Sequence, residues 1–178
     1  MAILILLILA IAAYHFIYDG IILPSIRQNS RNKLYQLRDE LRWEMIEGID
    51  NNDIPAFNLV HDSLNVFVNR LPMITLSMQK QFHTDLQNNE TLQKTINKRK
   101  KTIEDCSNSK IKQIVLDIND ILEATYIANA GGWFIYILPI ALTASLLEKI
   151  EEDAKELSFA PKHEVYRIIP TTVKAAHC

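Results

Sequence analysis

Two ionisable side chains, His15 and Asp19, interrupt an otherwise apolar N-terminal stretch, and their types and spacing suggest a chemical role. A separation of four residues places both on one face of a helix. A charged side chain facing lipid costs about 2.5–3.5 kcal/mol on insertion scales, so such residues usually face water or a partner. In one interpretation, the pair joins Tyr14 and Tyr18 in a belt at the membrane interface. In the other, His15 and Asp19 line an aqueous pore, which requires an oligomer because one helix cannot enclose a cavity.

The rest of the chain lacks the common catalytic and metal-binding motifs. It has no P-loop, no GxSxG, no HExxH and no cluster of cysteines and histidines. The pairs His61–Asp62 and His83–Asp85 each put a histidine near a carboxylate, a spacing that is more typical of surface residues. We therefore predict that the protein is not an enzyme and has no catalytic residues, no metal site and no cofactor.

The apolar stretch itself is long enough to cross a membrane. Ala2–Leu23 comprises 22 residues, or about 33 Å as a helix, against a hydrocarbon core of roughly 30 Å. A cleaved signal peptide is the alternative, but no lysine or arginine precedes the apolar run. The sequence thus favours an uncleaved transmembrane signal anchor over residues 1–23.

An arginine stripe follows the anchor, comprising Arg27, Arg31, Arg38 and Arg42. On a single helix running to about Ile49, these four residues lie within an arc of about 60°. The stripe could contact a neighbouring subunit in an oligomer or bind a ligand such as a phosphate group. It could equally be a solvated face with local ion pairs. Because positive charge follows the span and none precedes it, we expect the N-terminus outside and the bulk of the chain in the cytoplasm.

Residues 24–125 read as a cytoplasmic helical bundle. The 178-residue chain has only four glycines and six prolines, and apolar residues recur at helical spacing in several segments, which predicts an all-α fold. Asp53 is the expected N-cap of one helix, with Pro55 in its first turn. The basic run Lys98–Lys101 lacks interleaved aromatic residues and is interpreted as a solvated helix end, so no direct nucleic-acid binding is expected.

The segment 126–147 carries no charged residue. Its length fits a second membrane span, while Asn129, two glycines and Pro139 would weaken an isolated helix. The alternative is an apolar helix buried in an interface. The C-terminal tail, residues 148–178, contains the stretch "HEVYRIIPTTV", which we expect to be extended.

The order of these segments resembles a known type of antiviral membrane protein. The anchor, the "RNKLYQLRDELR" helix, the "VHDSLNVFVNRLP" helix and the late "GGWFIYILPIAL" segment together are similar to the membrane accessory protein of type VI-B CRISPR loci. Two-span membrane effectors of some retrons are similar in second place. The CRISPR family implies a ring-like homo-oligomer in the bacterial inner membrane that forms a pore, depolarises the cell and enhances the defence given by an RNA-guided nuclease.

The same resemblance raises the question of nuclease activity. The family has been discussed as carrying a divergent HEPN motif, but no arginine here precedes a histidine at the Arg-x4-6-His spacing. That absence argues against a nuclease and leaves the pore function unaffected. The alternative function is a non-conducting, membrane-anchored adaptor that docks a cytoplasmic partner.

Overall fold

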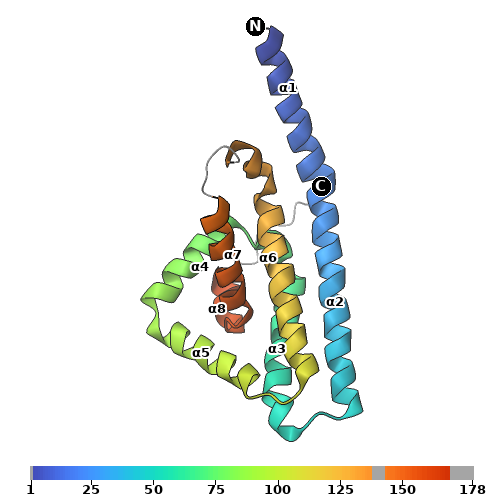
Figure 1. The fold of residues 1–178 in the computed structure, drawn as a ribbon, viewed down its shortest axis with the longest axis vertical. Coiled ribbons are helices and arrows are strands. Elements are labelled where there is room, and N and C mark those ends of the chain that lie inside the picture. Colours follow the sequence, from blue (N-terminus) through green and yellow to red (C-terminus); the bar gives the residue numbers. More distant parts are fainter. Residues whose placement is uncertain (1, 138–142, 169–178) are drawn as a thin grey trace.

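The protein is a helical bundle with one helix projecting from it (Figure 1). The computed structural model describes residues 2–137 and 143–168. Helices account for 90% of these residues and no strand occurs among them, which confirms the all-α prediction. The α-helices are α1 (Ala2–Ile17), α2 (Leu23–Glu47), α3 (Ile54–Val68), α4 (Leu76–Asn88), α5 (Glu90–Glu104), α6 (Ser109–Ile137), α7 (Thr143–Ser158) and α8 (Lys162–Ile168). The shorter turns are the π-helical η1 (Tyr18–Ile22) and the 3-10 turns η2 (Asn51–Asp53) and η3 (Leu71–Met73).

The elements α1, η1 and α2 form one continuous rod of 46 residues, Ala2–Glu47 (Figure 1). Pro24, in the first turn of α2, does not interrupt the rod, because the chain passes through η1 just before it. Proline has no N–H to donate to the carbonyl four residues back, and its ring crowds that carbonyl. Here the preceding residue, Leu23, donates to the carbonyl of Tyr18, five residues back, which is the π-helical pattern.

The N-terminal part of the rod makes few contacts with the bundle. None of the residues of α1 or η1 is buried, and Leu23, at 7% exposure, is the first that is. Ala2–Ile22 is therefore an exposed apolar helix of about 32 Å. Among residues 2–137 and 143–168, this rod is the one helix whose length and composition suit a membrane crossing.

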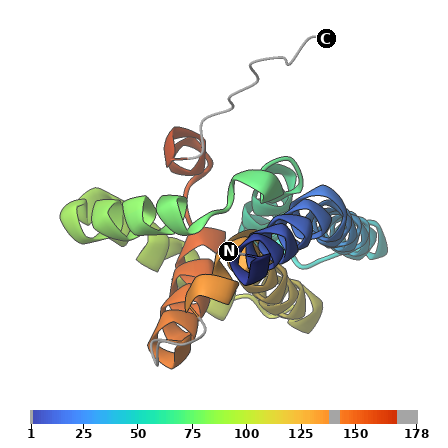
Figure 2. The same cartoon turned by 90° about the horizontal axis from the view of Figure 1, so that it is seen from above.

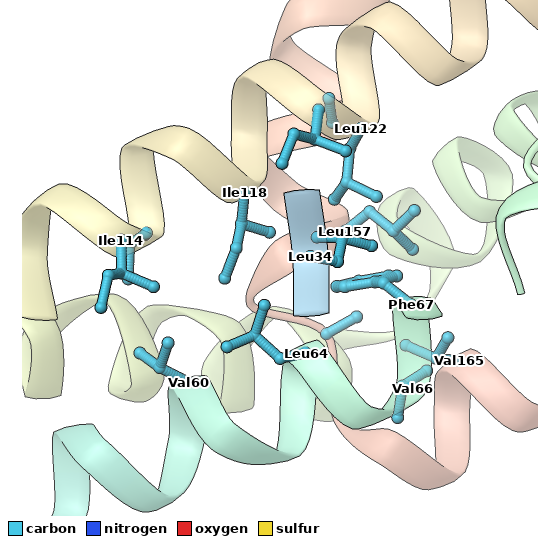
Figure 3. Packing of buried hydrophobic residues seen from close by; sticks show 14 of the residues in the cluster. Leu34, Val60, Leu64, Val66, Phe67, Ile114, Ile118, Leu122, Leu157 and Val165 are labelled. Carbon is cyan, nitrogen blue, oxygen red and sulfur yellow. The ribbon is translucent and has the colours of Figure 1, made fainter. Parts of the chain in front are cut away.

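The core lies where α2 and α3 pack against α6 (Figure 3). The helix α7 packs against α6 on the side away from α2 (Figure 1). Apolar residues at helical spacing supply it, among them Leu34, Val60, Leu64, Phe67, Ile114, Ile118, Leu122 and Leu157. Complete burial of one such side chain contributes about 1.5–3 kcal/mol. The bundle therefore holds α2 firmly, and α2 in turn determines the direction in which α1 projects.

The remaining helices complete the bundle on the side away from α2. Figures 1 and 2 show α4 and α5 extending from that side, joined by a short connection. The helix α8 packs against α3 and α4. Lys162–Ile168 is therefore helical, so the expectation of an extended stretch is wrong for this part of the tail. Residues 169–178 lie outside the described residues.

Asp53 links two loops at the end of the bundle away from α1. It occupies the N-cap position of α3, as expected, but its side chain makes no capping bond there. Its carboxylate instead accepts hydrogen bonds from the backbone N–H of Ser107 at 2.8 Å, the hydroxyl of Ser107 at 2.7 Å and the N–H of Asn108 at 3.1 Å. These bonds, led by that from the Ser107 hydroxyl, lower the pKa of Asp53 below its ordinary value.

We predict that Asp53→Asn lowers the melting temperature at neutral pH by roughly 3–8 °C, because an amide replaces a charged acceptor that three donors share. A carboxylate with a lowered pKa stabilises the fold above its unfolded pKa, and this contribution is lost as pH falls through the folded value. The difference between parent and variant should therefore be full at pH 7 and shrink below about pH 4.

Thermal unfolding followed by circular dichroism in detergent, from pH 7 to pH 2, measures this difference. Asp105→Asn is the matched control, since Asp105 is an exposed carboxylate in the same loop. A parent–variant difference that does not change with pH would contradict the assignment.

Candidate functional site

The predicted pore-lining pair lies near the point where the exposed rod meets the bundle. His15 Nδ1 is 3.6 Å from Asp19 Oδ2, and the two side chains are 33% and 60% exposed. They therefore share one face, as their spacing predicts, on which Asp19 is exposed and His15 is partly buried. His15 belongs to α1 and Asp19 to η1.

Two tyrosines on the adjacent face attach the rod to α6. The rings of Tyr14 and Tyr18 stack with centroids 5.7 Å apart. The hydroxyl of Tyr18 donates to the carbonyl of Ala128 at 2.7 Å, and that of Tyr14 reaches the carbonyl of Gly131 at 3.4 Å. Both tyrosines therefore contact α6 within the same chain. The interpretation of Tyr14 and Tyr18 as an interfacial belt did not include this contact.

Gly131 makes this approach possible. A Cβ atom built at Gly131 would lie 1.9 Å from the Tyr18 hydroxyl oxygen and 2.5 Å from the ring carbon that carries it. Any larger residue would displace the Tyr18 side chain. The glycine that seems to weaken the helix in the sequence is therefore the residue that lets α6 pack against η1.

A polar cluster extends this contact toward the bundle. Arg27 Nε donates to Asn129 Oδ1 at 2.8 Å, and the Asn129 amide nitrogen donates to the carbonyls of Leu71, at 3.0 Å, and Ile74. Burial lowers the pKa of the Arg27 guanidinium, while the nearby Asp19 carboxylate acts in the opposite direction. Asn129 thus joins α2 to η3 through α6, a role that its position in an apolar segment does not reveal.

The arginine stripe divides into an inner and an outer half. Arg27 and Arg31 are partly buried, and Arg31 Nε donates to the carbonyl of Val68 at 3.2 Å. Arg42, in the outer half, is exposed and lies 3.7 Å from Asp39, whereas Arg38 is partly buried, with its guanidinium 4.7 Å from the ring centroid of Tyr35. Arg27 and Arg31 therefore hold the fold, and Arg42 is the member of the stripe that a neighbouring molecule can reach.

The basic run Lys98–Lys101 is similarly divided. Lys98 and Lys101 are exposed, as a solvated helix end requires. Arg99, however, donates to the carbonyl of Ala160 at 3.0 Å, and Lys100 forms an ion pair with Glu156. For these two residues the interpretation as a solvated end is wrong, because α5 lies beside α7 and the turn that precedes α8.

The histidines among the described residues make separate contacts and do not form one cluster. His83 pairs with Asp153 at 3.4 Å, whereas Asp85, its neighbour in the sequence, pairs with Arg167. Asp153 is buried and also accepts a hydrogen bond from Gln79 at 2.7 Å, so the cluster ties α4 to α7. Within the described ranges, no group of three or more histidine, cysteine or acidic side chains could hold a metal ion.

His61 stands apart from that cluster. Its ring stacks on Phe57 with centroids 5.8 Å apart, and burial lowers the pKa of its imidazole below the ordinary value. The neighbouring Arg42 lowers it further, while Asp62 has the opposite effect. These contacts favour a neutral, packed histidine.

An open groove lies between α5, α6 and α7, and the sequence analysis did not predict it. Its lining includes Ile103, Val115, Leu116 and Phe159, together with Lys100, Glu104, Lys112, Asn119 and Lys155. Asn119 is buried, and its Oδ1 atom has no hydrogen-bond partner in the described part of the chain. The groove draws its residues from three helices far apart in sequence, so no local pattern could have indicated it.

In comparisons with known proteins, no family model, no curated protein and no solved structure matches this chain.

We predict that Gly131→Ala destabilises the protein by about 1–3 kcal/mol, the usual cost of overpacking a well-filled contact. The added methyl group should displace the Tyr18 side chain and break its bond to Ala128. In a Tyr18→Ala background the same substitution should cost almost nothing, because the obstructing ring is gone. Thermal unfolding of the two single variants and the double variant measures this coupling.

Gly20→Ala is the control, since a Cβ at Gly20 meets no atom within 4 Å. Gly131→Ala could lower stability equally with and without the Tyr18 ring. That result would show that Gly131 serves the flexibility of the helix and not the contact between Tyr18 and α6.

Proposed function

We propose that the protein is a pore-forming membrane effector that assembles into a ring-like homo-oligomer. The observation that carries this proposal is the exposed Asp19 carboxylate, 3.6 Å from His15, on a lone apolar helix. In lipid, that carboxylate needs water or a protein partner, since an exposed charge costs several kcal/mol. A ring of copies supplies both, with one carboxylate from each copy near the inner mouth of the opening.

The orientation of the chain follows from charge. Arg27, Arg31, Arg38 and Arg42 all follow the span, and no basic residue precedes it. We infer that the bundle lies in the cytoplasm and the N-terminus outside, in a bacterial inner membrane. Arg42 is then the candidate of the stripe for contacts between copies, because its side chain is 49% exposed, against 24% for Arg38.

The resemblance to the accessory protein of type VI-B CRISPR loci supplies the biological role. We propose that opening of the pore depolarises the membrane during phage infection and thereby enhances antiphage defence. The link to an RNA-guided nuclease is functional, and no direct contact with nucleic acid is proposed.

One observation favours a second candidate, a membrane-anchored adaptor that conducts nothing. The groove between α5, α6 and α7 combines apolar side chains with three lysines and the unpartnered Asn119 oxygen. Such a surface suits an apolar partner that carries acidic groups. An adaptor would use this groove and would leave the membrane sealed.

We predict that the purified protein in planar bilayers conducts cations, and that Asp19→Asn lowers cation conductance or selectivity while leaving the oligomer intact. A ring of carboxylates favours cations and raises their local concentration. Single-channel recording, with size-exclusion chromatography of each variant, makes the measurement.

Asp105→Asn serves again as the control, because it removes an exposed carboxylate from the far end of the bundle. Currents from Asp19→Asn equal to those of the parent would reduce the His15–Asp19 pair to an interfacial belt. A parent protein that inserts and never conducts would favour the adaptor.

A further inference from the structure

The end of α6 lies beside the membrane helix. The carbonyls of Ala128 and Gly131 meet the hydroxyls of Tyr18 and Tyr14, so α6 runs antiparallel to the rod at this point. Beyond Gly131, α6 continues for six residues to Ile137, or about 9 Å. Figure 1 shows its end beside the lower part of α1 and well short of the N-terminus. If Ala2–Ile22 occupies the membrane, the end of α6 occupies part of the same layer.

The sequence of this region suits lipid. No charged residue occurs from Ala124 to Leu147, a stretch flanked by Glu123 and Glu148. Its backbone is helical as far as Ile137, so the peptide groups before the last turn of α6 are satisfied within the helix, as a hydrocarbon environment requires. Trp133 and Tyr136 belong to the residue types that are enriched at membrane interfaces.

The chain then returns to the side from which it came. The helix α7 begins at Thr143 and packs against α6. It contributes Asp153 to the contact with Gln79 and His83 of α4, and Glu156 to that with Lys100 of α5. Because α6 and α7 belong to one packed bundle, the segment between them cannot end on the opposite side of a membrane.

We propose that the C-terminal part of α6, Ala128–Ile137, enters the membrane from the side of the bundle, beside α1, and that the chain has returned to that side in α7. This inference rests on the proposed membrane span of α1 and deepens it, since lipid becomes a partner of α6 as well. Each copy would then place two helices in the half of the bilayer nearest the bundle and α1 alone beyond the end of α6. Such an asymmetric insertion suits a protein that perturbs the bilayer.

The two tryptophans of the chain, Trp43 and Trp133, allow a direct test. In the full chain carrying Trp43→Phe, Trp133 is the one remaining tryptophan. The protein is reconstituted into phosphatidylcholine–phosphatidylglycerol vesicles whose acyl chains are brominated at a shallow, a middle or a deep position. Gly131 lies level with Tyr14, and Trp133 follows two residues later, level with about the middle of Ala2–Ile22. Bromine quenches tryptophan on contact, so we expect a strong loss of Trp133 emission with deep bromine and progressively less with shallower bromine.

Two further variants separate the inference from the span on which it rests. In Trp133→Phe, the exposed Trp43 of α2 should be insensitive to bromine and quenched by aqueous iodide. In a third variant, Phe16→Trp with both native tryptophans changed to phenylalanine, the new tryptophan reports on α1 itself.

Quenching by bromine at both Phe16→Trp and Trp133 supports the inference. Quenching at Phe16→Trp with Trp133 accessible to iodide alone overturns it and leaves the span intact. Strongest quenching of Trp133 by shallow bromine overturns its place beside the middle of α1, and absence of quenching at both positions removes the proposed span. Circular dichroism of each variant checks that the helical fold is kept.

Discussion

The contact between Tyr18 and the backbone of α6 determines how the bundle sits against the apolar helix. The Tyr18 hydroxyl can reach the carbonyl of Ala128 because Gly131 offers no side chain in its way. The pair Arg27–Asn129 extends the same junction toward the bundle. Since α1, η1 and α2 form one continuous rod, a change in the tilt of α1 must strain this junction or move α2. The apolar helix is therefore a rigid extension of the bundle, and the position of one fixes that of the other.

This junction also explains why the Asp19 carboxylate stays exposed. Consecutive residues on a helix differ by about 100° in direction, so a side of the rod that presents Tyr18 to α6 turns Asp19 away from it. The bundle therefore occupies one side of the rod and leaves the Asp19 side chain 60% exposed. Arg42, an exposed member of the arginine stripe, lies farther along the same rod, beyond the junction. In the proposed effector, copies would assemble through α1 and α2 without disturbing the core of each subunit.

Local pattern was enough to predict the helices, and distance along the chain explains what it missed. Apolar spacing indicated α3 and α6, and the apolar stretch indicated an exposed helix ahead of Leu23. The role of Asp53 was missed because its partner Ser107 is 54 residues away, and that of His83 because Asp153 is 70 residues away. Such pairs depend on how the helices pack, which no single segment encodes. The His15–Asp19 geometry could be predicted because both residues belong to one helical turn, whereas what the face meets depends on other molecules.

The most direct test of the central claim is a structure of the full-length particle extracted in mild detergent, determined by electron cryo-microscopy. We expect a closed ring of identical copies in which every Asp19 faces the central opening and every bundle lies on one side of the detergent belt. A particle that contains one copy of the chain, or a ring in which Asp19 faces the detergent, would contradict the pore.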